Sequence, residues 1–92
     1  MRQSIYAQSM DDDMIIIDSA RKHGITDDEI LFVFENAINS IMLNEQPLKI
    51  MLFGFDSIGR ALEIGYFMND NDDCIIMHAM KIRKIYQKYL YF

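Results

Sequence analysis

One histidine and a group of cations stand close together near the C-terminal end of the sequence, and they are the side chains best suited to chemistry. An imidazole can take up or release a proton near neutral pH, and lysine and arginine side chains can hold a phosphate group. His78 lies in the apolar stretch 74–80, and a basic stretch follows it. The cations of that basic stretch are Lys81, Arg83, Lys84 and Lys88. The pattern indicates an anion site beside a general acid or base.

A second group of candidates lies earlier in the chain and comprises Lys22, His23 and Arg60. Both groups also have a structural interpretation. Cations near the end of a helix are favoured by the helix dipole, which accounts for Lys22 and His23 without a site. A histidine in an apolar strand can likewise be a hydrogen-bonded core residue. Spacing alone leaves the structural and the functional interpretation open.

Several other kinds of site lack the residues that they need. One cysteine and two scattered histidines do not make a zinc ligand set, so we expect neither a metal nor a cofactor. The sequence holds no P-loop and no G-x-G-x-x-G pattern. Cys74 and His78 are four residues apart in one expected strand, which separates them by about 13 Å and excludes a Cys-His nucleophile pair.

Length and charge narrow the range of functions. The 92 residues, 51% of them hydrophobic, suffice for one domain. The net charge is −5, and residues 78–92 hold four of the nine cations and none of the fourteen acids, so a basic end follows a body of net charge −9. Tight non-specific binding of nucleic acid needs a surface that is basic throughout, and an acidic body argues against one.

The sequence predicts neither export nor a membrane span. The single Cys74 cannot form an intramolecular disulfide, and its apolar surroundings are typical of a buried thiol in a reducing compartment. No apolar run approaches the roughly 20 residues that cross a bilayer. Residues 1–13 end in three aspartates rather than in the pattern of a signal peptide. We therefore expect a cytoplasmic protein that does not bind membranes.

Two helices are predicted in the N-terminal half, after a flexible arm over residues 1–13. Residues 14–23 carry apolar side chains at helical spacing, with cations in the last turn and Gly24 at the usual stop position. Thr26-Asp27-Asp28-Glu29 is a capping box, so a second and strongly apolar helix should run from there to about Asn39.

The C-terminal half predicts strands and then a closing helix. Strands are expected over residues 40–43, 48–55, 60–68 and 74–80. In the last strand, the two-residue period places Cys74, Ile76, His78 and Met80 on one face. After Lys81 the apolar residues return at helical spacing. The predicted fold class is α+β, with two N-terminal helices, an antiparallel meander of three or four strands, and a C-terminal helix, the helices covering one face of the sheet.

Four short motifs follow one another in a fixed order between residues 15 and 90. They are Lys22-His23-Gly24-Ile25 before the capped helix, Val33-Phe34-Glu35-Asn36 within it, Gly54-x-Asp56-x-x-Gly59-Arg60-x-Leu62 with Tyr66-Phe67, and Ile75-Ile76-Met77-His78-Ala79-Met80. This order resembles the BrnT-type toxins. It is also similar to a related group of small predicted toxins, which carry a His-Ala-Met segment followed by an arginine and a Tyr-Leu pair, as Arg83 and Tyr89-Leu90 do here.

The resemblance implies one RelE/BrnT-like domain over residues 14–92 and a toxin of a type II toxin-antitoxin module. Such a toxin is a metal-independent endoribonuclease, an mRNA interferase, which acts on free or ribosome-bound mRNA and is neutralised by a cognate protein antitoxin. A second copy of the chain is a further candidate partner, as a homodimer.

Metal-free RNA cleavage needs a base for the 2′-OH proton, an acid for the leaving oxygen, and cations for the growing charge on phosphate. Under the resemblance, His78 is one proton-transfer group and Lys22 or His23 is the other, while Arg83 stabilises the charge. The residues that hold phosphate and RNA are then Arg60, Lys81, Lys84 and Lys88.

Two features depart from the pattern of that family. Met80 stands where BrnT-type toxins carry an arginine, and the chain as a whole is acidic. Both features also fit a relative that has lost catalysis and acts as a protein-protein interaction module, with its apolar helix 26–39 and its aromatic C-terminal end seeking a partner. Whether the chain is an enzyme therefore stays open in the sequence.

Overall fold

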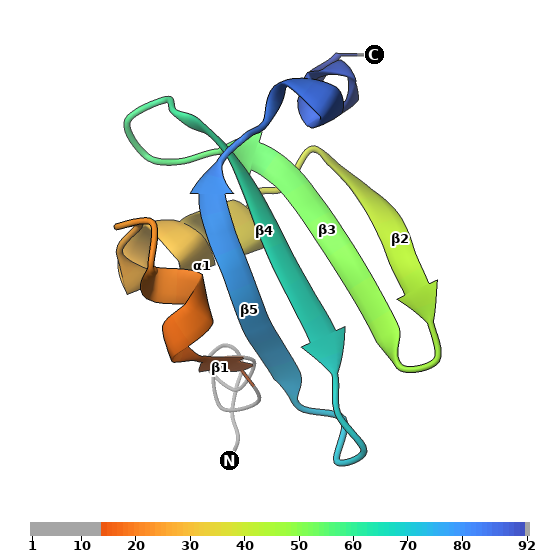
Figure 1. Ribbon diagram of the computed structural model, residues 1–92. Coiled ribbons are helices and arrows are strands. Elements are labelled where there is room, and N and C mark those ends of the chain that lie inside the picture. Colours follow the sequence, from red (N-terminus) through yellow and green to blue (C-terminus); the bar gives the residue numbers. More distant parts are fainter. Residues whose placement is uncertain (1–13, 92) are drawn as a thin grey trace.

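A five-stranded mixed sheet forms the centre of the computed structural model, which describes residues 14–91 (Figure 1). The elements in chain order are β1 (Met14–Ile16), the 3₁₀-helix η2 (Asp18–Arg21), α1 (Asp27–Glu35), β2 (Asn39–Glu45), β3 (Leu48–Phe55), β4 (Ala61–Met68), β5 (Cys74–Lys81) and the 3₁₀-helix η3 (Lys84–Leu90). The strand order across the sheet is β1-β5-β4-β3-β2. Strands β2 to β5 each run antiparallel to the next, and β1 runs parallel to β5.

The predicted fold class is wrong, beginning with its first helix. Residues 14–23 form β1 and then the single turn of η2. Three consecutive isoleucines are β-branched and favour an extended backbone. The outer edge of β5 supplies hydrogen-bond partners for that backbone, as shown by the Ile17 N–H, which donates to the Ile76 carbonyl at 3.1 Å. Pairing with a strand about 60 residues away thus overrides the helical spacing, and a five-stranded mixed sheet replaces the expected three- or four-stranded meander.

The closing helix was also predicted incorrectly, because residues 84–90 form the 3₁₀-helix η3. Its two inward aromatic rings pack on Phe53 of β3, with ring centroids 5.3 Å (Tyr86) and 5.1 Å (Tyr89) from the Phe53 ring. The Asn39 side-chain amide donates to the Tyr89 carbonyl at 3.1 Å and ties η3 to the start of β2. The predicted N-terminal arm, residues 1–13, lies outside the described residues.

Helix α1 begins as the capping box predicts and ends earlier than expected. The Thr26 hydroxyl accepts the Glu29 backbone N–H at 3.2 Å. The helix ends at Glu35, and the Asn36 side chain donates to the Phe32 carbonyl at 2.8 Å. A Cβ at Gly54 would lie 3.2 Å from the Ala37 Cα, so glycine permits the chain after α1 to approach β3 closely.

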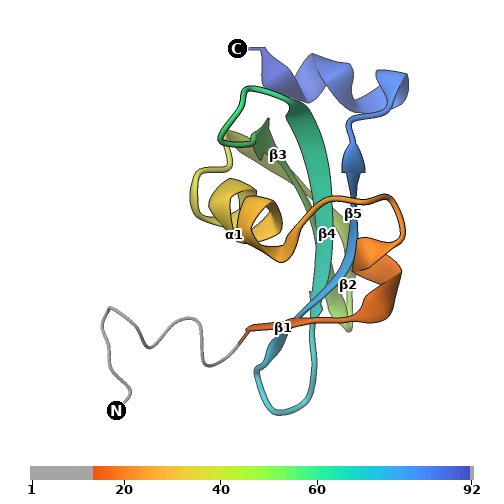
Figure 2. The same cartoon turned by 90° about the vertical axis from the view of Figure 1, so that its left-hand side faces the viewer.

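The hydrophobic core lies between α1 and one face of the sheet, while η2 lies on the other side beside β5 (Figure 2). Its buried members are Ile25, Ile30, Val33, Leu62, Ile64, Cys74, Ile76 and Ala79, and the same cluster extends to Ala20 of η2. The opposite face of the sheet is covered in part by η3 at the Phe53 end. The helices were predicted to cover one face of the sheet only. Instead α1 covers one face, and η3 covers part of the other.

A β-bulge in β5 moves His78 to the face opposite α1. Tyr66 pairs with Ile76 and Gly65 pairs with His78, so Met77 has no partner of its own in β4. The predicted two-residue period placed Cys74, Ile76, His78 and Met80 on one face. The extra residue reverses the alternation, so that Cys74 and Ile76 face the core while His78 and Met80 face the other way.

Candidate active site

Glu63 is a buried carboxylate around which the candidate site is built. It lies on β4 with its side chain 0% exposed, on the face that also carries His78. Its Oε2 atom lies 2.7 Å from the His78 Nε2 atom, and it accepts the Arg83 Nη2 and Nε groups at 2.6 and 3.0 Å. The Arg83 backbone N–H donates to Oε1 at 2.9 Å. A buried charge is tolerated only when it is paired in this way.

The ion pair between Glu63 and Arg83 fixes the charge of both groups. Burial opposes ionisation of the carboxylate, but the hydrogen bonds from Arg83 and His78 outweigh it and hold the pKa of Glu63 below its usual value. The hydrogen bond to Glu63 raises the pKa of Arg83 in turn. The Arg83 guanidinium also lies 5.2 Å from the centre of the Tyr86 ring, so η3 supports it from the other side.

His78 is oriented by Glu63 and adjoins a second imidazole. Because the ionised carboxylate can only accept, the His78 Nε2 atom carries the hydrogen of the shared bond, and a neutral His78 ring keeps its lone pair on Nδ1. The His78 side chain is 24% exposed, so part of the ring is open to solvent. The His23 and His78 rings form a T-shaped pair, with 76° between the ring planes and 6.1 Å between the centroids. Two groups that can transfer protons are therefore in contact.

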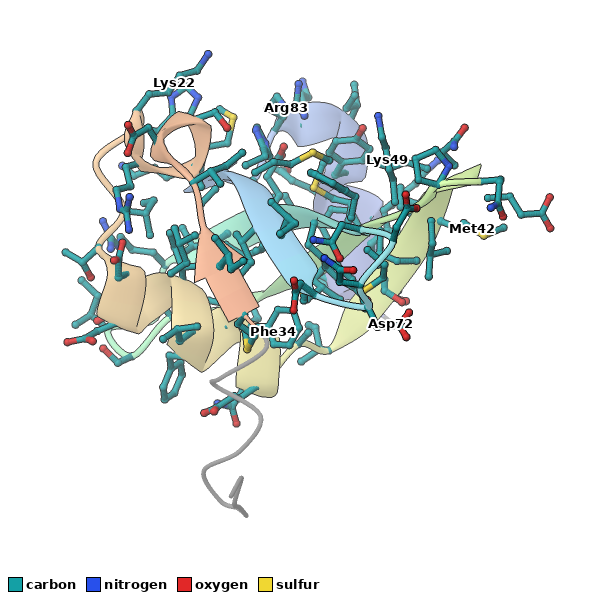
Figure 3. All side chains as sticks on the ribbon, turned by 90° about the horizontal axis from the view of Figure 1, so that it is seen from below. Lys22, Phe34, Met42, Lys49, Asp72 and Arg83 are labelled. Atoms are coloured by element: carbon teal, nitrogen blue, oxygen red, sulfur yellow. The ribbon has the colours of Figure 1, made fainter. Side chains whose placement is uncertain are left out.

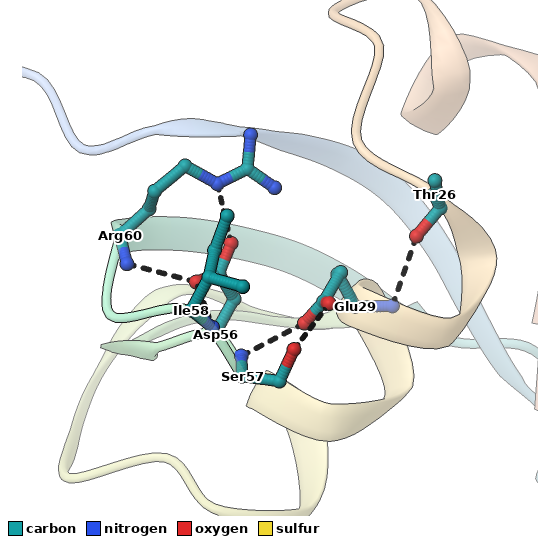
Figure 4. A network of polar contacts seen from close by, with 6 residues as sticks. All are labelled: Thr26, Glu29, Asp56, Ser57, Ile58 and Arg60. Atoms are coloured by element: carbon teal, nitrogen blue, oxygen red, sulfur yellow. Dashed lines mark hydrogen bonds and ion pairs between the residues drawn. The ribbon is translucent and has the colours of Figure 1, made fainter.

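Arg60 is held by a second buried carboxylate in the turn between β3 and β4 (Figure 4). Asp56 accepts the backbone N–H groups of Ile58 (3.1 Å) and Arg60 (2.8 Å) on Oδ1, and the Arg60 Nε group on Oδ2. Burial opposes ionisation, but the bonds from Arg60 and Ile58 hold the pKa of Asp56 below its usual value. The terminal nitrogens of Arg60 have no hydrogen-bond partner among the described residues and can bind an anion.

The same turn is attached to α1 by Glu29. The Glu29 carboxylate accepts the Ser57 backbone N–H at 2.8 Å and also the Ser57 hydroxyl. The capping box predicts that Glu29 returns to its own helix start, and this half of the motif is replaced by the bonds to Ser57. The start of α1 thus fixes the position of the turn that carries Arg60.

A pocket of about 230 Å³ lies beside Arg60 and the end of β5. It is lined by His23, Ile25, Arg60, Met80 and Lys81. Two cations and an imidazole therefore meet two apolar side chains. The mixture suits a ligand with an anionic end and an apolar end better than it suits a simple ion.

The structure brings five of the eight predicted site residues together. They are His78 and Arg83 on Glu63, and His23, Arg60 and Lys81 around the pocket. Lys22 and Arg83 lie on the same side of the sheet, opposite Phe34 of α1, but Lys22 does not line the pocket (Figure 3). Lys84 and Lys88 are exposed on η3, and the Lys88 amine lies over the Tyr89 ring at 5.3 Å. Neither Lys84 nor Lys88 lines the pocket, so the structure does not support their predicted role in binding phosphate.

Sequence reasoning missed the two carboxylates that hold the site, Glu63 and Asp56. The sequence could have indicated Glu63, because it is the single acid in the apolar stretch 61–68. It could have indicated Asp56 as an acid four residues before an arginine in a turn. Met80, which interrupted the family resemblance, lines the pocket as an apolar wall.

Other chemistry finds little support among the described residues. Cys74 is a buried free thiol, as predicted, and burial raises its pKa to about 11, so it is not a ready nucleophile. Within residues 14–91, no three His, Cys, Asp or Glu side chains gather closely enough to hold a metal ion. No helix in that range has both the length and the apolar composition to cross a membrane. No protein-family model, curated protein or solved structure matches the chain, so the argument for function depends on this geometry.

Proposed function

We propose that the chain is a metal-independent endoribonuclease that acts on mRNA, and that it is the toxin of a type II toxin-antitoxin module. One observation carries the enzymatic part: the carboxylate-bound His78 contacts a second imidazole, His23, beside a pocket that presents Arg60 and Lys81. The order of sequence motifs that resembles the BrnT-type toxins supports the biological part.

The reaction needs one proton to leave and one to arrive. His78 Nδ1 takes the proton of a ribose 2′-OH, and the 2′-oxygen attacks the adjacent phosphorus. A bond forms between phosphorus and the 2′-oxygen, and the bond to the 5′-oxygen of the next nucleotide breaks. Protonated His23 gives its proton to that leaving oxygen. The products are a 2′,3′-cyclic phosphate and a free 5′-hydroxyl, and the two histidines exchange protonation states.

Glu63 and the cations act on charge and orientation. The carboxylate fixes the tautomer of His78 and stabilises the imidazolium that forms when the ring takes a proton. Arg60 and Lys81 lie where they can neutralise the non-bridging phosphate oxygens. Arg83 holds Glu63 ionised and is therefore a positioning residue in this scheme. Lys22 does not line the pocket, so His23 takes the second proton-transfer role.

The biological setting follows from the substrate. An activity on mRNA belongs in the cytoplasm, and a cell that carries it needs a protein antitoxin to survive. The expected result of expression without an antitoxin is growth arrest with loss of full-length mRNA.

Growth arrest on expression tests this proposal. We expect the double variant His78→Ala/Arg83→Ala to abolish arrest at equal protein level, since acid-base catalysis contributes about 10²–10⁴ in rate. Arg21→Ala is the matched control, because Arg21 also pairs with carboxylates, Asp18 and Asp27, but at an exposed position in η2. If the double variant arrests growth as the parent does, the ribonuclease mechanism is wrong.

That second outcome would favour a non-enzymatic interaction module. Its support is the exposure of large apolar side chains such as Ile58 (73%) and Ile85 (68%). An arrest that survives loss of His78 and Arg83 would then come from binding a cellular protein, and surface substitutions at these isoleucines would abolish it.

A further inference from the structure

The pocket beside Arg60 is lined by two cations, an imidazole and two apolar side chains. Arg60 and Lys81 can bind an anion, and Ile25 and Met80 offer apolar surface beside the His23 ring. We propose that this pocket binds one unpaired nucleotide of RNA, with the base against the apolar side chains and the phosphate on the two cations. The choice of RNA as the ligand rests on the proposed function.

Arg60 is already held in position by Asp56 in the absence of a ligand. Asp56 is 4% exposed and fixes Arg60 through the backbone N–H and the Nε group, so the guanidinium keeps its place without substrate. Its terminal nitrogens, unbonded among the described residues, form a planar fork that matches two phosphate oxygens. Because the Asp56 charge is taken up by these bonds, the carboxylate does not present itself as a competing anion at the pocket.

The apolar lining residues of the pocket, Ile25 and Met80, suit a planar base. Bases in single-stranded RNA stack on imidazole, aromatic and other flat or apolar surfaces, and this stacking is largely independent of sequence. His23 is exposed and lines the pocket, so its ring can contact a base there. Met80 has a flexible, polarisable thioether that can adapt to different bases. The pocket is therefore expected to accept all four bases with modest preference.

Size and position select the substrate class. At about 230 Å³ the pocket is smaller than the roughly 300–1,000 Å³ typical of drug-sized ligands, so it holds one nucleotide and not several. Bases in an A-form duplex stay stacked and paired and cannot enter it. Met80 and His78 lie on the same face of β5, two residues apart, so a base on Met80 places an adjoining phosphodiester near His78.

Binding of small fragments tests the pocket without any cleavage. The probes are inorganic phosphate, ribose 5-phosphate and the four nucleoside 5′-monophosphates, titrated against ¹⁵N-labelled protein and followed by NMR. We expect the nucleotides to bind at least about fivefold more tightly than ribose 5-phosphate, with shifts at His23, Arg60 and Lys81. Met80→Ala should lower nucleotide affinity about five- to tenfold and leave ribose 5-phosphate binding unchanged.

Two further variants keep the test decisive. Met80→Leu should bind nucleotides as the parent does, because leucine keeps an apolar side chain at this position. Met42→Ala is the matched control, since Met42 is 59% exposed on β2, the edge strand at the far side of the sheet. Equal affinity for nucleotides and ribose 5-phosphate, or no effect of Met80→Ala in a protein with an unchanged spectrum, would overturn the base site. If the protein cleaves RNA but gives this result, the proposed nucleotide pocket is wrong and the proposed ribonuclease function stands. If the protein binds nucleotides but does not cleave RNA, the pocket stands and the ribonuclease function is wrong.

Discussion

Two buried carboxylates each hold an arginine, and they do so in different ways. Asp56 and Arg60 are four residues apart in one turn, and the carboxylate also accepts backbone N–H groups of that turn. Glu63 draws its partners from residues 15 and 20 positions away, His78 in β5 and Arg83 after it. The first unit is complete within a turn, whereas the second exists only when the sheet has formed in the right register.

Under the proposed function, this difference assigns binding to one unit and catalysis to the other. The turn unit presents the free end of a guanidinium to the pocket and has no proton-transfer group, so it can hold phosphate but cannot cleave it. In the sheet unit the arginine is paired with the carboxylate, and the partly exposed His78 imidazole is the proposed proton-transfer group. Changes in the first should alter affinity for RNA, and changes in the second should alter the rate of cleavage.

The largest effect is expected from Glu63→Gln. The variant loses the charge that sets the tautomer of His78, so the single-turnover rate of RNA cleavage should fall by at least about 100-fold. It also leaves Arg83 without its partner and should lower the free energy of unfolding by about 1–3 kcal/mol. Cleavage kinetics and urea unfolding measure the two effects. A rate within threefold of the parent would show that Glu63 has only a structural part.

A smaller and different effect is expected from Asp56→Asn. The amide cannot pair with the Arg60 guanidinium as an ion, so Arg60 loses its fixed position and the KM for RNA should rise about tenfold, with kcat changed less than threefold. Steady-state kinetics on a short RNA measures the split. If kcat falls and KM does not, the division between a binding unit and a catalytic unit is incorrect.

The smallest effect concerns stability at acid pH. The pKa of Glu63 is lowered in the folded protein, so its ionisation stabilises the fold above the usual glutamate pKa of about 4.3, and this contribution is lost as pH falls through the folded value. The pKa of Asp56 is lowered too, and it contributes with the same sign. Thermal unfolding between pH 6 and 2.5 should show a fall in stability that is shallower in Glu63→Gln. An equal slope in parent and variant would remove Glu63 from this account.

The local parts of the molecule could be predicted from the sequence. The strand predicted over residues 48–55 has the observed bounds, and the Thr26 cap correctly predicted the start of α1. Gly59 lies in the turn before β4 and has a φ of 88°, a conformation that glycine adopts without strain. Each of these features depends on neighbours within a few residues.

The parts that failed depend on contacts between distant segments. β1 requires the edge of β5, and the helical spacing of residues 14–23 contains no information on that edge. The bulge at Met77 is visible only in the pairing of β4 with β5, so the sequence assigned His78 to the wrong face. Glu63 became the centre of the site because Arg83 and His78 reach it, which no local pattern encodes. The predicted roles of His23, His78 and Arg60 stay hypotheses until cleavage is measured.

The chemical ends of the cleaved RNA test the central claim most directly. Purified protein is incubated with a defined single-stranded RNA in excess EDTA, and the products are identified by mass spectrometry, in parallel with His78→Ala and Glu63→Gln. The account predicts 2′,3′-cyclic phosphate and 5′-hydroxyl ends from the parent, and at least about 100-fold less product from each variant. Intact RNA with the parent protein, or equal cleavage by His78→Ala, would contradict it.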